Sequence, residues 1–515
     1  MSKVLGNISV VGTLTLVSRF MGLARDVLFF SAFGASVYGE AFILAFTLPN
    51  LFRRMLGEGT LTSAFIPVYA ETFKLNSQLQ AFTLLNQVLS RLFTFLFVCT
   101  VFVCSLSLAA SEFNWLSQSK WTDASFLNSI IFGYVLFVCG TAVLVGALNS
   151  HGSFFAGGFS PIILNLAMIS VLLFYTLNED LDLGSLSIYL CSCVVLAGLI
   201  QFFIPFRELR KKKKWNFKFD LKESPELLKI KKIFWIGAIG AAVAQINILV
   251  SRVLAYSLDE TGGVSYLFLS SRLIELPLGV FALSISTVLF PELAKSATLQ
   301  NRDSFLHSFF NGFRLTLAIT LPAAIGLGCL AEPILSVLFQ WGRFGKEEVS
   351  IAADILVISV AGLPFYAISS FLVKAFHSEK KMKPPVKSAV LSLLVNIALS
   401  LLLMDLAGVR GLALANVLAA IIQTIYLIFQ FNGFRLIHLI KIRPVFFFPI
   451  ILSSFFMTAV VLIFDSWIVF KFDHLSNFLR LTILIPAGAF SYFIAITALG
   501  FPEAKKMYGK LIGSF

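Results

Sequence analysis

Arginines are the residues of this sequence with the most definite chemistry, because they interrupt or terminate long apolar segments. They occur in SRFMGLARD, LPNLFRRMLGEG and SSRLIELPLG, as Arg19, Arg25, Arg53, Arg54 and Arg272. A guanidinium keeps its charge, and placing one at the centre of a membrane helix costs about 3 kcal/mol or more. Since its paired donors suit phosphate oxygens, the pattern predicts a polar pathway for a phosphate-bearing substrate.

The neighbouring acids are too few to neutralise these arginines. Asp26 follows Arg25, Glu58 follows Arg54 in GEG, and Glu275 lies one helical turn after Arg272. The surplus positive charge predicts that an anion arrives from outside the protein. A purely structural reading stays open, in which the acids form ion pairs with the nearest arginines.

Two further features have alternative readings. Arg53 and Arg54 can also be cations at the end of a helix, whose side chains reach the membrane surface. Glu40 lies at the opposite, outer end of the same apolar segment and is either a helix cap or a proton-sensitive gate.

Catalytic and metal-binding patterns are missing from the sequence. The six cysteines lie in apolar runs without zinc-ligand spacing, and no nucleotide-binding or hydrolase motif occurs. We therefore expect no metal, no cofactor and no enzymatic activity. Energy for transport would come from the membrane potential or an ion gradient.

Composition places the chain among polytopic membrane proteins. It has 515 residues, of which 58% are hydrophobic and 13% charged, whereas soluble domains are about 25% charged. A membrane helix needs roughly 20 apolar residues. About fourteen segments qualify, at 8–33, 38–56, 82–109, 126–149, 160–178, 184–206, 232–257, 263–289, 306–331, 350–376, 386–405, 411–433, 445–469 and 478–500.

The loops indicate the orientation. Loops after even-numbered segments are basic, including the lysines at 211–214, and those after odd-numbered segments lean acidic. This predicts cytoplasmic termini. The lysine run reads as an anchor on anionic lipid, and nucleic-acid binding is disfavoured because no recognition module accompanies it. The six tryptophans fall near segment ends, as an interfacial belt would.

The two halves of the sequence resemble each other at an offset near 230 residues. Val17-Ser18-Arg19 recurs at 250–252, Leu48-Pro49 at 276–277, and Asn165 corresponds to Asn396. This predicts an all-α fold of two pseudo-symmetric six-helix lobes plus two C-terminal helices, a design typical of transporters. The expected divisions are 1–210 for the N-lobe, 211–231 for a basic cytoplasmic loop, 232–434 for the C-lobe, and 435–515 for the last two helices and tail.

The stretches GEAFILAFTLPNLFRRMLGEG, TSAFIPVYAE, SRLIELPLGVFALSISTVLFPELA and LFQWGRF, together with SRFMGLARD, resemble the MurJ (MviN) family. These are bacterial lipid II flippases of the multidrug/oligosaccharidyl-lipid/polysaccharide exporter superfamily. The resemblance implies an inner-membrane protein that moves the undecaprenyl-diphosphate-linked peptidoglycan precursor outward by alternating access. It implies that diphosphate binds to the arginines of a central cavity, and that acidic family positions act in gating or ion pairing. The diphosphate residues are Arg19, Arg25, Arg53 and Arg272, and the acids are Asp26, Glu40, Glu58 and Glu275.

One departure from the family concerns a sodium site. Some relatives carry acids where this chain has Ser251 and Ser400, beside the position of Asn396. This remnant set is a poor cation site, which favours coupling to the membrane potential or to protons.

We expect a monomer whose partners are lipid II and membrane lipids, without nucleic acid. The alternative is a flippase for another polyprenyl-diphosphate glycan, such as an O-antigen or capsule unit. An enzyme acting on lipid-linked sugars would need paired acids or a metal site, and a passive scaffold would not need buried arginines.

Overall fold

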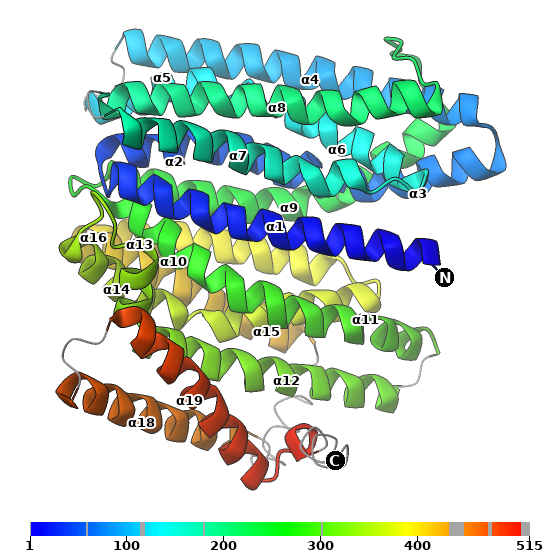
Figure 1. Cartoon of the computed structure of the whole chain (residues 1–515). Helices are drawn as coiled ribbons and strands as arrows, with labels where there is room; N and C mark the ends of the chain where they lie inside the picture. Colours follow the sequence, from blue (N-terminus) through cyan, green and yellow to red (C-terminus); the bar gives the residue numbers. More distant parts are fainter. Residues whose placement is uncertain are drawn as a thin grey trace. The chain divides into compact units, whose positions relative to one another are not determined.

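The computed structural model describes residues 2–57, 60–113, 119–178, 181–299, 302–431, 447–471 and 476–505. Every regular element in these ranges is a helix, which confirms the all-α class (Figure 1). The chain divides into two compact units. Unit 1 contains Met1–Ser257 and Trp341–Phe344, and unit 2 contains Leu258–Gln340 and Gly345–Phe515.

Unit 1 is built from long helices in which α1 packs against α7, α6 against α8, and α3 against α9. Its elements are α1 (Ser2–Phe33), α2 (Val37–Phe52), η1 (Arg53–Gly57), α3 (Thr60–Leu75), α4 (Gln78–Glu112), α5 (Ser119–Ile131), α6 (Tyr134–Ser150), α7 (Phe155–Leu177), α8 (Leu183–Lys213) and α9 (Pro225–Ser257).

In unit 2, α11 and α15 pack against α12, and the α18–α19 hairpin lies against α12 and α13. Its elements are α10 (Gly263–Pro277), η2 (Leu278–Ala282), α11 (Leu283–Thr298), α12 (Arg302–Cys329), α13 (Ala331–Phe339), α14 (Lys346–Val360), α15 (Leu363–Ser378), α16 (Lys383–Gln430), α18 (Phe448–Lys471) and α19 (Asn477–Ala498).

Short polar side chains start several of the helices. Ser36 accepts a hydrogen bond from the Gly39 amide at the start of α2, and Ser77 does the same for Gln80 at α4. Asp182 accepts from the Ser185 amide at α8. Such caps satisfy backbone donors that the first helical turn leaves unpaired.

Membrane-spanning capacity agrees with the sequence prediction in kind. Within the described ranges, eight helices are long and apolar enough to cross a membrane, or up to ten if each bent helix pair is one span. The number fourteen stays a prediction.

The predicted internal repeat has structural counterparts in the order and bending of the helices. Pro49 in α2 precedes the π-helix η1, and Pro277 in α10 precedes the π-helix η2. A proline has no N–H for the preceding turn, and a π segment restores the hydrogen bonding with a wider turn. Later in each half a bent pair follows, α5–α6 at 40° and α14–α15 at 42°.

The second apolar segment, predicted at 38–56, corresponds to α2 and η1, which together cover residues 37–57. Arg53 and Arg54 lie at the end of this segment, in its π-helical part. Pro49 lies inside α2 and does not terminate the helix.

The compact units do not coincide with the predicted lobes. Packing places α9 in unit 1, whereas the repeat begins its second half at residue 232. The units are defined by packing, whereas the lobes are defined by the repeat in the sequence. The lobe boundaries therefore stay a prediction.

Candidate functional site

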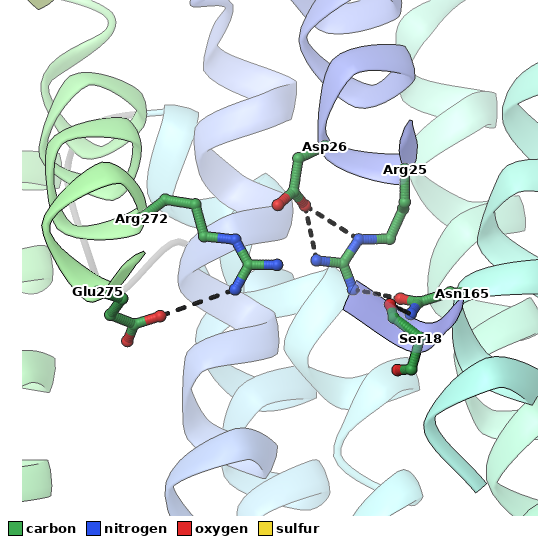
Figure 2. Close-up of polar contacts among 6 residues, drawn as sticks. All are labelled: Ser18, Arg25, Asp26, Asn165, Arg272 and Glu275. Carbon is green, nitrogen blue, oxygen red and sulfur yellow. Dashed lines mark hydrogen bonds and ion pairs between the residues drawn. The ribbon is translucent and has the colours of Figure 1, made fainter. Parts of the chain in front are cut away.

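Arg25 is the centre of a polar cluster in unit 1. Its Nε and Nη2 donate to Oδ1 of Asp26 at 3.0 and 2.6 Å, and its Nη1 donates to Oδ1 of Asn165 at 3.1 Å. The Asn165 amide nitrogen donates to the backbone oxygen of Ser18 at 3.0 Å. Figure 2 shows Arg25 held between Asp26 on α1 and Asn165 on α7.

This cluster satisfies its charges internally. The Arg25 side chain is 14% exposed and the Asp26 side chain 4%, so the pair is largely removed from water. The structural reading left open by the sequence, an Arg25–Asp26 ion pair, is therefore present in this conformation. A substrate phosphate would have to compete with Asp26 for the guanidinium.

Arg19 lies on α1 six residues before Arg25 and has a different environment. Its side chain is exposed, and it forms no ion pair with any described residue. In a membrane helix such a cation needs water or an anionic ligand.

Arg53 lies in η1, where its Nε donates to Oδ1 of Asn50 at 2.9 Å. π segments within helices often occur at functional sites, because the wider turn displaces side chains from the regular helical positions. Glu58, the predicted acid of this motif, lies outside the described residues.

Glu40 is buried in the first turn of α2. The cap of this helix is Ser36, whose side chain accepts from Gly39, so the cap reading of Glu40 is wrong. Glu40 lies near Tyr256 of α9, and Arg252 on the same helix donates to the Thr47 hydroxyl of α2. Polar contacts thus join α2 to α9.

In unit 2, Arg272 and Glu275 form the i, i+3 pair that their spacing predicts. Nη1 of Arg272 lies 3.7 Å from Oε2 of Glu275, and the two side chains are 36% and 47% exposed (Figure 2). This pair is longer and more exposed than Arg25–Asp26, so its arginine is more open to an added anion.

The residues of the sodium-site remnant are buried. In α16 the Ser400 hydroxyl donates to Oδ1 of Asn396 at 3.3 Å, and Ser251 is buried in α9. Within the described ranges, no group of three or more His, Cys, Asp or Glu side chains is arranged to hold a metal.

Three polar contacts of the structure were not foreseen by the sequence reading. Asn165 was noted only as a repeat position, although it orients Arg25. Lys374 of α15 donates to the Thr287 hydroxyl of α11 at 3.1 Å. Arg314 of α12 is buried and pairs with Glu503, and its guanidinium lies 4.8 Å from the ring centroid of Phe501. The sequence signal for these contacts was a polar residue within an otherwise apolar segment.

Comparison with known proteins identifies the group to which these features belong. The family model described as lipid II flippase MurJ matches residues 29–482. This chain belongs to the lipid II flippase MurJ family. The resemblance seen in the sequence is thereby confirmed, and Arg53, Asn165 and Arg272 lie within the matched region.

Individual relatives agree with this assignment. The probable lipid II flippase MurJ of Haemophilus influenzae is 31% identical over 513 residues, covering 95% of this chain and 98% of the relative. The protein of the same name from Bdellovibrio bacteriovorus is 34% identical over 434 residues, covering 82% and 81%.

Solved structures extend the likeness to the fold. A lipid II flippase MurJ in an inward closed conformation superposes with a TM-score of 0.75 at 26% identity, covering 98% of this chain and 99% of that one. An inward-facing MATE transporter of the MOP superfamily gives a TM-score of 0.67 at 13% identity, covering 81% and 95%. The second match shows a shared fold alone.

Proposed function

We propose that this chain is a lipid II flippase of the bacterial cytoplasmic membrane. It carries the polyprenyl-diphosphate-linked peptidoglycan precursor from the inner to the outer leaflet by alternating access. Family membership supports the substrate. The observation that carries the mechanism is the positive charge of α1, where Arg19 and Arg25 face only Asp26 as a neighbouring acid.

We assign the diphosphate to Arg19, Arg25, Arg53 and Arg272. A guanidinium offers two parallel N–H donors to phosphate oxygens, and such charge-assisted hydrogen bonds are shorter and stronger than neutral ones. Arg19 is the most accessible of the α1 pair and would engage first. Arg25 would follow by exchanging Asp26 for phosphate, which couples substrate binding to the α1–α7 contact through Asn165.

The remaining features of the proposal concern energy and orientation. The basic loops favour cytoplasmic termini. Ser251 and Ser400 provide hydroxyls where sodium-coupled relatives carry acids, so we assign the driving force to the membrane potential or to protons. Transport by a monomer needs no covalent step, and we assign no enzymatic activity.

Complementation tests this proposal. Cells depleted of their own lipid II flippase would receive the wild type or Arg19→Gln, Arg25→Gln, Arg53→Gln or Arg272→Gln, with membrane levels measured by immunoblot. We expect growth with the wild type and loss of growth with the variants. Arg210→Gln, at an exposed arginine near the end of α8, is the matched control and should grow normally.

Two outcomes would contradict different parts of the proposal. Failure of a well-expressed wild type would reject lipid II and favour another polyprenyl-diphosphate glycan, such as an O-antigen or capsule unit. Normal growth of all four variants at normal membrane levels would reject the diphosphate assignment and leave the substrate in place.

A further inference from the structure

The chain between α8 and α9 is a strap that side-chain hydrogen bonds fix along α4. We call residues 214–224 the strap. Its Trp215 is buried, and the indole Nε1 donates to Oδ1 of Asn86 at 2.9 Å. The helices α8 and α9 occupy the two ends of the predicted loop at 211–231 and leave the strap between them.

Further hydrogen bonds hold the strap against α4 between Asn86 and Arg91. The Asp220 amide donates to the Ser90 hydroxyl at 2.9 Å, and the Gln87 amide donates to Oδ2 of Asp220 at 3.2 Å. The Arg91 guanidinium donates to the Leu221 carbonyl at 2.6 Å. Strap side chains that remain exposed are therefore presented from a fixed position.

The exposed side of the strap combines aromatic and cationic groups. Phe217, Phe219 and Leu221 are 39%, 64% and 50% exposed. Exposed lysines alternate with them and continue onto the last turn of α8, at Lys211, Lys214, Lys218 and Lys222.

The acids of the strap offset only part of this lysine charge, at Lys222, whose ammonium group attracts the Asp220 carboxylate. Asp220 is held by α4, and the backbone N–H of Lys222 is the main cause that lowers the pKa of this carboxyl. Glu223 pairs with Lys231. None of the four exposed lysines forms an ion pair with another described residue.

The strap lies where its two neighbouring helices change from apolar to polar. One turn beyond Arg91, α4 begins to expose the apolar side chains Phe95, Val98 and Phe102. On α8, exposed Ile200 and Phe203 precede the lysine run. Both helices therefore place the membrane–water boundary at the strap, because the exposed apolar side chains of α4 and α8 belong in lipid and the lysines belong in water.

We propose that the strap is a binding site for anionic phospholipid headgroups. The lysine ammonium groups bind headgroup phosphates, and the Phe217 and Phe219 rings lie at the boundary between headgroups and acyl chains. A lipid partner fits better than a soluble protein because the aromatic groups are continuous with the lipid-facing surface of α4. The inference rests on α4 and α8 spanning a membrane, not on the identity of the transported lipid.

Photo-crosslinking tests this site in the full-length protein. Phe219 would be replaced by photoreactive p-benzoylphenylalanine, and the protein placed in vesicles of phosphatidylcholine and phosphatidylglycerol in equal amounts. After irradiation, mass spectrometry would identify lipid adducts. We expect adducts at position 219 with phosphatidylglycerol several-fold over phosphatidylcholine.

Matched positions on α4 serve as controls. The same probe at Phe102, in the lipid-facing region, should give lipid adducts without headgroup preference, and the probe at Leu79, at the far end of α4, should give few. Lys218→Glu with Lys222→Glu should abolish the preference at position 219 and leave adducts at position 102 unchanged.

Three results would overturn the inference. They are an absence of lipid adducts at position 219 when position 102 gives them, adducts at position 219 without preference for phosphatidylglycerol, and a preference that survives the double lysine variant. Each is independent of flippase complementation, so the lipid site and the transported substrate can fail separately.

Discussion

The two arginines of α1 differ in what holds them. Arg25 donates to Asp26 and Asn165, whereas Arg19 is exposed and forms no ion pair with any described residue. Removing the charge of an arginine that stabilises the fold should lower stability, whereas removing the charge of an arginine that binds a ligand should lower transport. This contrast separates the structural role of each residue from its role in transport.

Arg19→Gln should abolish transport while changing the free energy of unfolding by less than about 0.5 kcal/mol. Arg25→Gln should impair both, because it removes a charged partner of the buried Asp26 carboxylate, at a cost of about 3 kcal/mol. Thermal unfolding of the purified variants, beside complementation, measures the two effects. Equal destabilisation by both variants would contradict the distinction between them.

Asn165→Ala removes the hydrogen bonds to Ser18 and Arg25 without removing any charge. We expect a loss of about 1–3 kcal/mol in stability and reduced transport, because Arg25 loses a partner that orients it. Asn178→Ala is the control, since this exposed amide at the end of α7 bonds only its own helix, at Phe174. Unchanged unfolding and transport in Asn165→Ala would remove Asn165 from the proposed site.

At the scale of elements, α16 depends on one glycine where two helical segments meet. Gly408 has φ 53° and ψ −132°, and an added Cβ would lie 3.1 Å from Oε2 of Glu260. Gly408→Ala should lower stability by about 1–3 kcal/mol through backbone strain. Gly326→Ala in α12 is the control, because the nearest atom, Cε of Met457, is 3.8 Å away. Equal melting temperatures would contradict this.

The end of α6 should respond to acid. His151 lies 3.0 Å from the Tyr69 hydroxyl and stacks edge-on against Phe73. Burial, and then the charge of Lys213, lowers the pKa of His151 below its usual 6.5. The folded state therefore keeps this imidazole neutral after the unfolded chain has begun to take up a proton.

Stability from this neutral histidine is present above about pH 6.5 and is lost as the pH falls through the lower folded pKa. The melting temperature of the wild type should fall more between about pH 7 and about pH 5 than that of His151→Gln. Parallel pH profiles for the two proteins would show that other groups cause any acid sensitivity.

Sequence reasoning succeeded where local pattern determines the element. Apolar runs predicted the long helices, and the spacing of Arg272 and Glu275 predicted their pair. It failed where a contact depends on residues that are far apart in the sequence. The partner of Arg314, Glu503, is 189 residues away, and the strap is ordered by α4 side chains about 130 residues earlier.

At the scale of the whole molecule, the two halves repeat a helix with a proline, a π segment and a bent pair. Each half also contributes arginine to the proposed substrate set, through Arg19 and Arg25 in unit 1 and Arg272 in unit 2. Lipid II therefore matches both the family and the charge of this chain.

Direct measurement of lipid II on the outer membrane surface tests the central claim most closely. In flippase-depleted cells, externally added lipid II hydrolase would cleave only the precursor that has crossed the membrane, and the cleaved product would be quantified. The account predicts a high cleaved fraction with the wild type and a fraction near that of depleted cells with Arg19→Gln. Equal fractions for the wild type and an empty vector, with the protein present in the membrane, would contradict it.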